Sequence, residues 1–279
     1  MIDAALREFD SLWAGSEQPD LLEAALHVAR IGYPDLELAA VAARVEHLAE
    51  LAAARLADAP SEHMQLLRFN HFFFEELAFR GEQVDYYSPI NSFLNVVLDR
   101  RSGIPISLSV LFIAIGQRTG LHLSGIGLPA HFVVRHDAAD PAQRIYIDPF
   151  NRQVLPNREA CRRLISRISG REVTLDDEAF APQPVQAIVL RMLANLKGAY
   201  VRAQDFAQAV AVLDRILLLQ PDDGRQWRDR GLLHYQLGNL RQASIDLTRY
   251  LWLAGEDDER QQEAANVLQR IHERMLSLN

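Results

Sequence analysis

Three residues near the middle of the chain have the types and the order that proton transfer to and from a nucleophile requires: Ser107, His131 and Asp148. His131 begins a predicted strand, and Asp148 ends the next one. In such a site the carboxylate accepts a hydrogen bond from one imidazole nitrogen, which leaves the other nitrogen to take a proton from the attacking group. That group is expected at the start of the preceding apolar helix, where free backbone amides and the helix dipole favour an anion.

The attacking group is the weak point of this arrangement, because the helix start carries serine, which is a far weaker nucleophile than cysteine. Ser107 is the nearest hydroxyl, and Ser109 follows it. A helix N-terminus does not bring the pKa of a hydroxyl near 7, so Ser107 would depend entirely on His131 as its base. A serine at a helix start is more often simply an N-cap. Two hypotheses therefore stand: a Ser107-His131-Asp148 triad, or a remnant site that has lost its nucleophile.

Each candidate also has a purely structural interpretation. His131 would donate a hydrogen bond in the core, and Asp148, which precedes Pro149, would end its strand in a turn by accepting backbone amides. Cys161 is the lone cysteine; it lies after the strand aspartate, the wrong order for a nucleophile here, and a buried structural thiol is the favoured interpretation. His131 and His136 are five residues apart and would point to opposite faces of a strand, so we predict no metal site.

Composition limits the class of protein. The chain has 279 residues, of which 49% are hydrophobic and 24% charged, as in globular proteins, and its net charge of −8 argues against general binding to nucleic acid or an anionic membrane. The first residues carry acids where a secretion signal would carry Lys or Arg, and a single cysteine fits a reducing compartment. We therefore expect a cytoplasmic protein without a cofactor.

The apolar periodicity predicts an α+β fold. Leu and Ala recur at helical spacing through residues 1–80, and Phe72, Phe73 and Phe74 cannot share one helix face, so their helix should be enclosed on several sides. A buried helix is expected over 107–119, then a small sheet with strands near residues 122–128, 130–135 and 144–150, and a helix over 157–168.

The last third of the chain repeats with a period of 34 residues. Tyr200 aligns with His234, Ala209 with Ala243, and Leu213 with Leu247. This is the spacing of the tetratricopeptide helix pair, in which a small alanine lets two helices approach closely. We take the proline-containing stretch 176–185 as a linker, and predict two domains: residues 1–180, and residues 181–279 as an all-α repeat region.

With these segments together, the chain resembles the bacterial SirB-type family, a transglutaminase-like domain followed by tetratricopeptide repeats. The resemblance lies in YSPINSFLNVVLDRRSGIPISLS, LPAHFVVR, IDPFN and the 34-residue repeat. It implies a papain-related fold with a Cys-His-Asp site. His131 and Asp148 fall on the family's histidine and aspartate positions, whereas Pro105 falls where the cysteine belongs.

The sequence therefore predicts a non-catalytic interaction or regulatory protein, with a degenerate transglutaminase-like cleft and repeats that bind a protein or peptide partner. The alternative is a peptide-amide hydrolase or acyl transferase that uses Ser107, His131 and Asp148.

Overall fold

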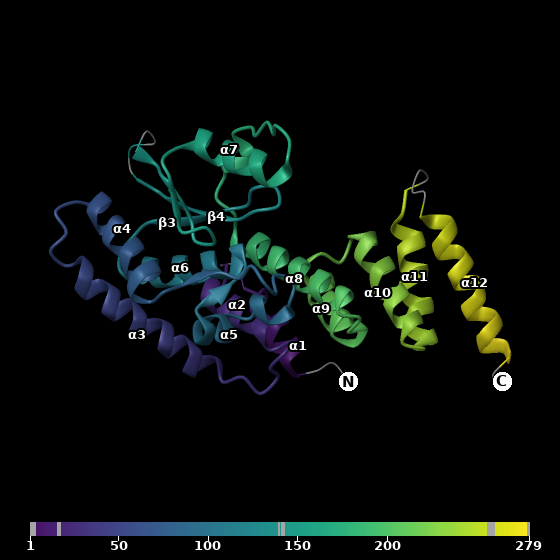
Figure 1. Ribbon diagram of the computed structural model, residues 1–279. Helices are drawn as coiled ribbons and strands as arrows, with labels where there is room; N and C mark the ends of the chain where they lie inside the picture. Colours follow the sequence, from purple (N-terminus) through teal and green to yellow (C-terminus); the bar gives the residue numbers. More distant parts are fainter. Residues whose placement is uncertain (1–3, 16–17, 139, 141–142, 256–259, 278–279) are drawn as a thin grey trace. The chain divides into compact units, whose positions relative to one another are not determined.

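The computed structural model of this protein describes residues 4–15, 18–138, 140, 143–255 and 260–277 (Figure 1). The chain divides into two compact units: residues 15–192 form one, and residues 1–14 group with 193–279 in the other. The sequence placed the domain boundary at 180/181. The division between the units falls at 192/193, inside the helix α8 (Val185–Arg202).

The unit of residues 15–192 is built around α6 (Pro105–Arg118), in which every residue from Pro105 to Gly116 is buried. Such complete burial confirms the predicted buried helix. The other helices of this unit are α2 (Leu21–Ala29), α3 (Leu38–Leu56), α4 (Glu62–His71), the π-helical turn η1 (Phe72–Glu76), η2 (Pro89–Ser92), α5 (Leu94–Arg100), α7 (Arg158–Ser169) and η4 (Glu178–Phe180).

The three consecutive phenylalanines form the π-helical turn at the end of α4, and all three are buried. Phe73 and Phe74 both meet Phe112 of α6, with ring centroids 5.1 and 5.9 Å apart. An α-helix would rotate one of three consecutive side chains away from a single neighbour. The π-helical turn and its enclosure by the core explain why the sequence tolerates three large aromatics in a row.

A four-stranded antiparallel sheet carries both strand residues of the candidate site. Its order is β3 (Leu123–Ile126), β4 (Val133–His136), β5 (Tyr146–Asp148) and β6 (Gln153–Leu155). Alternate residues face opposite layers: Val134 and Ile147 pack in the core around α6, whereas Val133 and Tyr146 pack with α7. Figure 1 shows α6 and α7 on opposite sides of the strands. The small antiparallel sheet agrees with the α+β prediction, and β6 is a strand that the sequence did not reveal.

A second, two-stranded ladder lies directly before α6. β1 (Arg80–Gly81) pairs in parallel with β2 (Ser102–Gly103), and the backbone of Glu82 continues the ladder by donating to the Gly103 carbonyl over 2.9 Å. This pairing brings the loop that follows β1 to the N-terminus of α6.

The stretch 176–185 is packed against the sheet. Phe180 is buried, Pro182 bridges to Ile126, and the amide of Gln183 donates to the Gly125 carbonyl over 2.9 Å. The segment thus covers the free edge of β3, because the buried aromatic outweighs the loop tendency of its prolines. It is part of the residue 15–192 unit, which corrects its interpretation as a linker.

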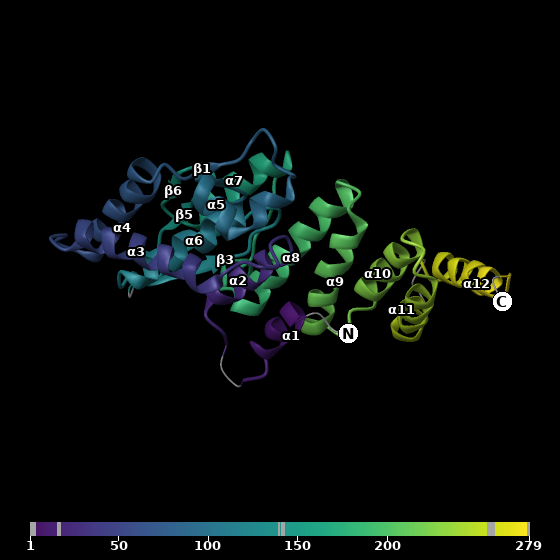
Figure 2. The same cartoon turned by 90° about the horizontal axis from the view of Figure 1, so that it is seen from below.

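The second unit consists of paired helices (Figure 2): α1 (Ala4–Ser11), the later part of α8, α9 (Phe206–Leu219), α10 (Gly224–Gln236), α11 (Leu240–Leu253) and α12 (Gln261–Ser277). A side chain at Gly231 would come within 2.9 Å of Leu247, and Ala209 and Ala243 are fully buried. These are the small residues that the repeat pattern places at close helix contacts. No helix in the described part of the chain has the length and apolarity to cross a membrane.

Candidate functional site

His131 and Asp148 lie together in the interior of the residue 15–192 unit. His131 Nε2 is 2.9 Å from Asp148 Oδ2, and the side chains are 4% and 0% exposed. The distance is that of a charge-assisted pair, although the ring is not aligned for a straight N–H···O bond. Because Asp148 faces Nε2, Nδ1 is the nitrogen left to exchange a proton with any further group.

Asp148 is held by more than the histidine. Its Oδ1 accepts from the backbone amides of Phe150 (3.1 Å) and Asn151 (3.2 Å), and its Oδ2 accepts from Asn151 Nδ2 (2.6 Å). Burial raises the pKa of this carboxyl, but the contact with His131 and the donors of Asn151 outweigh it, so the pKa of Asp148 lies below its usual value. Both interpretations of Asp148 therefore describe the same residue: it forms the turn and it faces the imidazole.

The loop that carries His131 is fastened to two helices. Arg191 of α8 donates through Nη2 to the carbonyls of Leu128 and His131, at 2.6 Å each. Ser109 of α6 donates to the Phe132 carbonyl at 3.4 Å. His131 itself lies just before β4, which begins at Val133. These bonds set the position of the imidazole relative to the N-terminal half of α6.

Aromatic side chains pack beside the imidazole. The Phe150 ring meets the His131 ring edge-on at 6.3 Å and the Tyr86 ring at 5.8 Å. Gly81 of β1 lies under Phe150: a Cβ at residue 81 would come within 2.6 Å of the Phe150 carbonyl. The glycine thus provides the space that lets Phe150 pack against the β1 backbone.

Ser107 is the third sequence candidate, and its hydroxyl is fully committed elsewhere. The side chain is 0% exposed. Its Oγ donates to the carbonyl of Asn91 (2.7 Å) or of Ile104 (3.1 Å) and accepts from the Ile104 amide (3.1 Å). The expectation that Ser107 is the N-cap was wrong: Ile104 occupies that position, Pro105 opens the helix and Ser107 stands two residues further on. Proline suits the first turn because its missing N–H would be unpaired there in any case.

Family models match most of this chain. A transglutaminase-like superfamily model covers residues 39–194, more than half of the sequence. The chain belongs to the transglutaminase-like superfamily. A tetratricopeptide repeat model matches residues 196–275, which supports the two-part architecture.

Relatives of the transglutaminase-like protein occur in bacteria and animals. A "UPF0162 protein" of Xylella fastidiosa is 36% identical over 84% of this chain and 83% of its own length, and one of Vibrio cholerae is 28% identical over 85% and 84%. The human "F-box only protein 21" is 27% identical over 85% of this chain but only 42% of its own length. No solved structure matches the chain.

Cys161 lies close to the candidate site of the transglutaminase-like domain but has the wrong chemistry for it. The side chain is fully buried on α7, within the cluster that includes Val133 and Tyr146. Burial, with the nearby negative charge of Asp148, raises the pKa of the thiol to about 12. Because the thiolate is the reactive form, the raised pKa makes this thiol a poor nucleophile.

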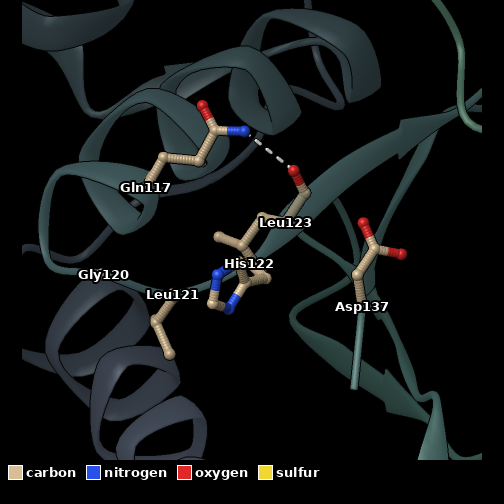
Figure 3. A pocket seen from close by; sticks show the side chains of 6 residues that line it. All are labelled: Gln117, Gly120, Leu121, His122, Leu123 and Asp137. Carbon is tan, nitrogen blue, oxygen red and sulfur yellow. Dashed lines mark hydrogen bonds between the residues drawn. The ribbon is translucent and has the colours of Figure 1, made fainter. Parts of the chain in front are cut away.

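An open depression in this unit lies near the C-terminal end of α6, away from Pro105. It measures about 440 Å³ and is lined by Gln117, Gly120, Leu121, His122, Leu123 and Asp137 (Figure 3). Two of the lining residues are joined by a hydrogen bond, which Gln117 Nε2 donates to the Leu123 carbonyl over 2.8 Å. Neither His131 nor Asp148 contributes to the lining. Within the described ranges, no group of three His, Cys, Asp or Glu side chains is placed to hold a metal ion.

Two residues of the site were missed by the sequence analysis, Asn151 and Arg191. Asn151 follows Asp148 by three residues, so the signal was the Asp-Pro-Phe-Asn turn itself, in which the amide returns to the carboxylate. Arg191 lies 60 residues after His131 on a helix, and it reaches the loop only through the tertiary fold. No local pattern marks such a residue.

Proposed function

We propose that this chain is a non-catalytic interaction protein, in which a degenerate transglutaminase-like domain is joined to tetratricopeptide repeats that bind a protein partner. The observation that carries the proposal is the state of the attacking group. Pro105 stands where the family resemblance expects a cysteine, and Ser107 is buried with its hydroxyl engaged by Asn91 and Ile104. A nucleophile must lie within hydrogen-bond reach of its base, and the Ser107 hydroxyl donates to Asn91 or Ile104 instead of His131.

The burial of the histidine pair supports the same conclusion. At 4% and 0% exposure, His131 and Asp148 are covered by protein. A substrate amide would have to displace covering protein groups to reach the imidazole. In this proposal, the pair of His131 and Asp148 and the hydrogen bonds from Arg191 have a structural role in the domain. The assignment to the SirB-type family, the cytoplasmic location and the absence of nucleic-acid or membrane partners are parts of the same proposal.

The repeat region supplies the binding function in this proposal. Helical repeats stack into extended surfaces because each pair buries its apolar face only against its neighbours. The family match over residues 196–275 and the buried small residues Ala209, Gly231 and Ala243 support such a stack.

The experiment combines a test for chemistry with a test for binding. Purified protein is treated with a fluorophosphonate probe and with peptide-amide substrates, alongside Ser107→Ala, His131→Gln and the matched control Ser109→Ala. The proposal predicts no labelling or turnover that depends on Ser107 or His131. The same full-length protein is cross-linked to partners it captures from its source cells, and the cross-links are mapped.

Cross-links from a stoichiometric partner to residues 193–279 are the expected result. Labelling that disappears in Ser107→Ala while persisting in Ser109→Ala, together with turnover lost in His131→Gln, would establish the hydrolase or acyl-transferase alternative in its place. Circular dichroism of each variant separates loss of chemistry from loss of fold.

A further inference from the structure

The outer face of α11 is an exposed stripe of apolar and cationic side chains. Arg241, Ile245, Thr248, Arg249 and Trp252 follow one another at helical spacing, and we call them the α11 stripe. Ile245 is 52% exposed and Trp252 is 71% exposed. The opposite face of the same helix buries Ala243, Leu247 and Tyr250. One face of α11 is therefore buried in the repeat stack, whereas the other face exposes a tryptophan.

The start of the α11 stripe borders a hollow. A shallow depression of about 610 Å³ is lined by Asn239, Leu240, Arg241, Gln242 and Ile245. An apolar side chain that entered this hollow would lie against Leu240 and Ile245. Exposed large apolar side chains are typical of protein interaction sites, where a Trp or Arg that becomes buried on binding supplies much of the binding energy.

The charge of the α11 stripe is positive. The Arg249 guanidinium stacks over the Trp252 ring at 4.4 Å and lies 3.8 Å from Asp222, whose side chain is 86% exposed. So exposed a pair is weak and leaves the arginine able to bind elsewhere. The single acid of α11, Asp246, is fully buried against Arg230 on the other face. The stripe is thus cationic on a chain whose net charge is −8.

We propose that the α11 stripe binds an acidic amphipathic helix of a partner protein. This deepens the proposed function, on which it rests, by naming the surface and the chemistry of the partner. Carboxylates of the partner helix pair with Arg241 and Arg249, while its large apolar side chains cover Ile245 and Trp252. A symmetric second copy is the poorer occupant, because a two-fold axis would bring four arginines into one interface.

The length of the stripe sets the length of the partner. From Arg241 to Trp252 the helix rises about 16 Å, which is three turns. A partner helix of about 16 residues, with leucines on one stripe and glutamates flanking it, covers this distance with about one turn to spare. Its lysine-flanked twin has the same apolar surface and the opposite charge.

The test measures binding of these two synthetic peptides to the full-length protein by calorimetry and, in the proteins that keep Trp252, by tryptophan fluorescence. We expect the glutamate peptide to bind more tightly than its twin and to weaken with added salt. The double variant Ile245→Ala/Trp252→Ala should lose at least about tenfold in affinity. The double variant Arg241→Glu/Arg249→Glu should reverse the preference between the peptides. Leu276→Ala, which removes an exposed leucine from α12, is the matched control and should bind normally.

Equal affinity for the two peptides, or affinity unchanged by Ile245→Ala/Trp252→Ala, would overturn the assignment. The proposed function can fail separately. If the captured partner still cross-links to residues 193–279 in the Ile245→Ala/Trp252→Ala variant, the repeats bind proteins but the α11 stripe is not where they do so.

Discussion

Asp148 in the transglutaminase-like unit and Asp246 in the repeat unit are both completely buried, yet their partners differ in kind. Asp246 binds Arg230 through both carboxylate oxygens, at 2.7 and 2.8 Å, and Gln242 adds a third bond at 2.9 Å. Arg230 also reaches Asp214 at 2.7 Å. A guanidinium stays charged at every pH at which proteins fold, so this network joins α9, α10 and α11 permanently.

Asp148 instead faces the imidazole of His131, whose Nε2 lies 2.9 Å from Oδ2. The comparison teaches that burial and close pairing do not by themselves mark a functional site, because the repeat unit holds an equally buried carboxylate in a network that joins three helices. What distinguishes the pair of His131 and Asp148 is that the carboxylate faces an imidazole and not a guanidinium. The transglutaminase-like unit therefore pairs a buried imidazole with a buried carboxylate, while the hydroxyl of Ser107 is bound to Asn91 and Ile104.

The largest expected effect is on the permanent network. Asp246→Ala leaves the largely covered guanidinium of Arg230 with Asp214 alone, and removing one partner of a buried pair costs about 3–5 kcal/mol. Amide hydrogen exchange in α10 and α11 should accelerate accordingly, while exchange in β4 and β5 stays unchanged. Asp222→Ala, which removes an 86% exposed partner of Arg249, is the control and should have little effect. Equal protection in the two variants would mean that the network contributes nothing.

Asp148→Ala should destabilise its own unit by about 3 kcal/mol, because it removes the acceptor of two backbone amides as well as the partner of His131. The loss is expected to be smaller than for Asp246, because Arg230 keeps a permanent positive charge when its partner is removed. Hydrogen exchange in β4 and β5 reports it. Asp99→Ala, which breaks the exposed contact with Arg44, is the matched control. A loss exceeding that of Asp246→Ala would contradict this ranking.

The pH dependence sharpens the contrast further. The pKa of Asp148 is depressed in the folded state, so its contribution to stability is complete above its unfolded pKa of about 4 and is lost as pH falls through the lower folded value. The difference in free energy of unfolding between the wild type and Asp148→Asn should therefore shrink between about pH 5 and about pH 2. Urea denaturation followed at β-sheet amides measures it. A difference that stays constant over this interval would show that the charge of Asp148 is not what stabilises the pair.

The sequence could place the histidine and the aspartate but not their surroundings. The order of strands brings the end of β5 beside the start of β4, and the apolar runs that form these strands are visible in the chain. The contact of Asn151 with Asp148 depends on the conformation of a turn, and the contact of Arg191 with the His131 carbonyl depends on the position of a helix distant in sequence. Neither contact produces a periodic pattern in the sequence. In the same way, the prolines of 176–185 favour a linker, but the burial of Phe180 makes the segment part of the folded unit.

The start of α6 is the clearest case in which local rules competed. Ser107 looked like an N-cap because serine is a favoured one, whereas proline at the first helical position is an equally valid start signal. The structure follows the proline, which moves the cap to Ile104 and places the hydroxyl of Ser107 within reach of that residue's amide and carbonyl.

This arrangement yields the smallest of the expected effects. Ser107→Ala removes the donor to Asn91 and the acceptor of the Ile104 amide, and should cost about 1–2 kcal/mol. Ser109→Ala, which loses a single long bond to Phe132, should cost less. Thermal unfolding of both variants ranks them. If Ser107 were held for catalysis at the expense of stability, its removal would leave the protein as stable as the wild type or more so. A clear loss of stability in Ser107→Ala, without any loss of fluorophosphonate labelling, therefore identifies the serine as part of the fold in which His131 and Asp148 are kept.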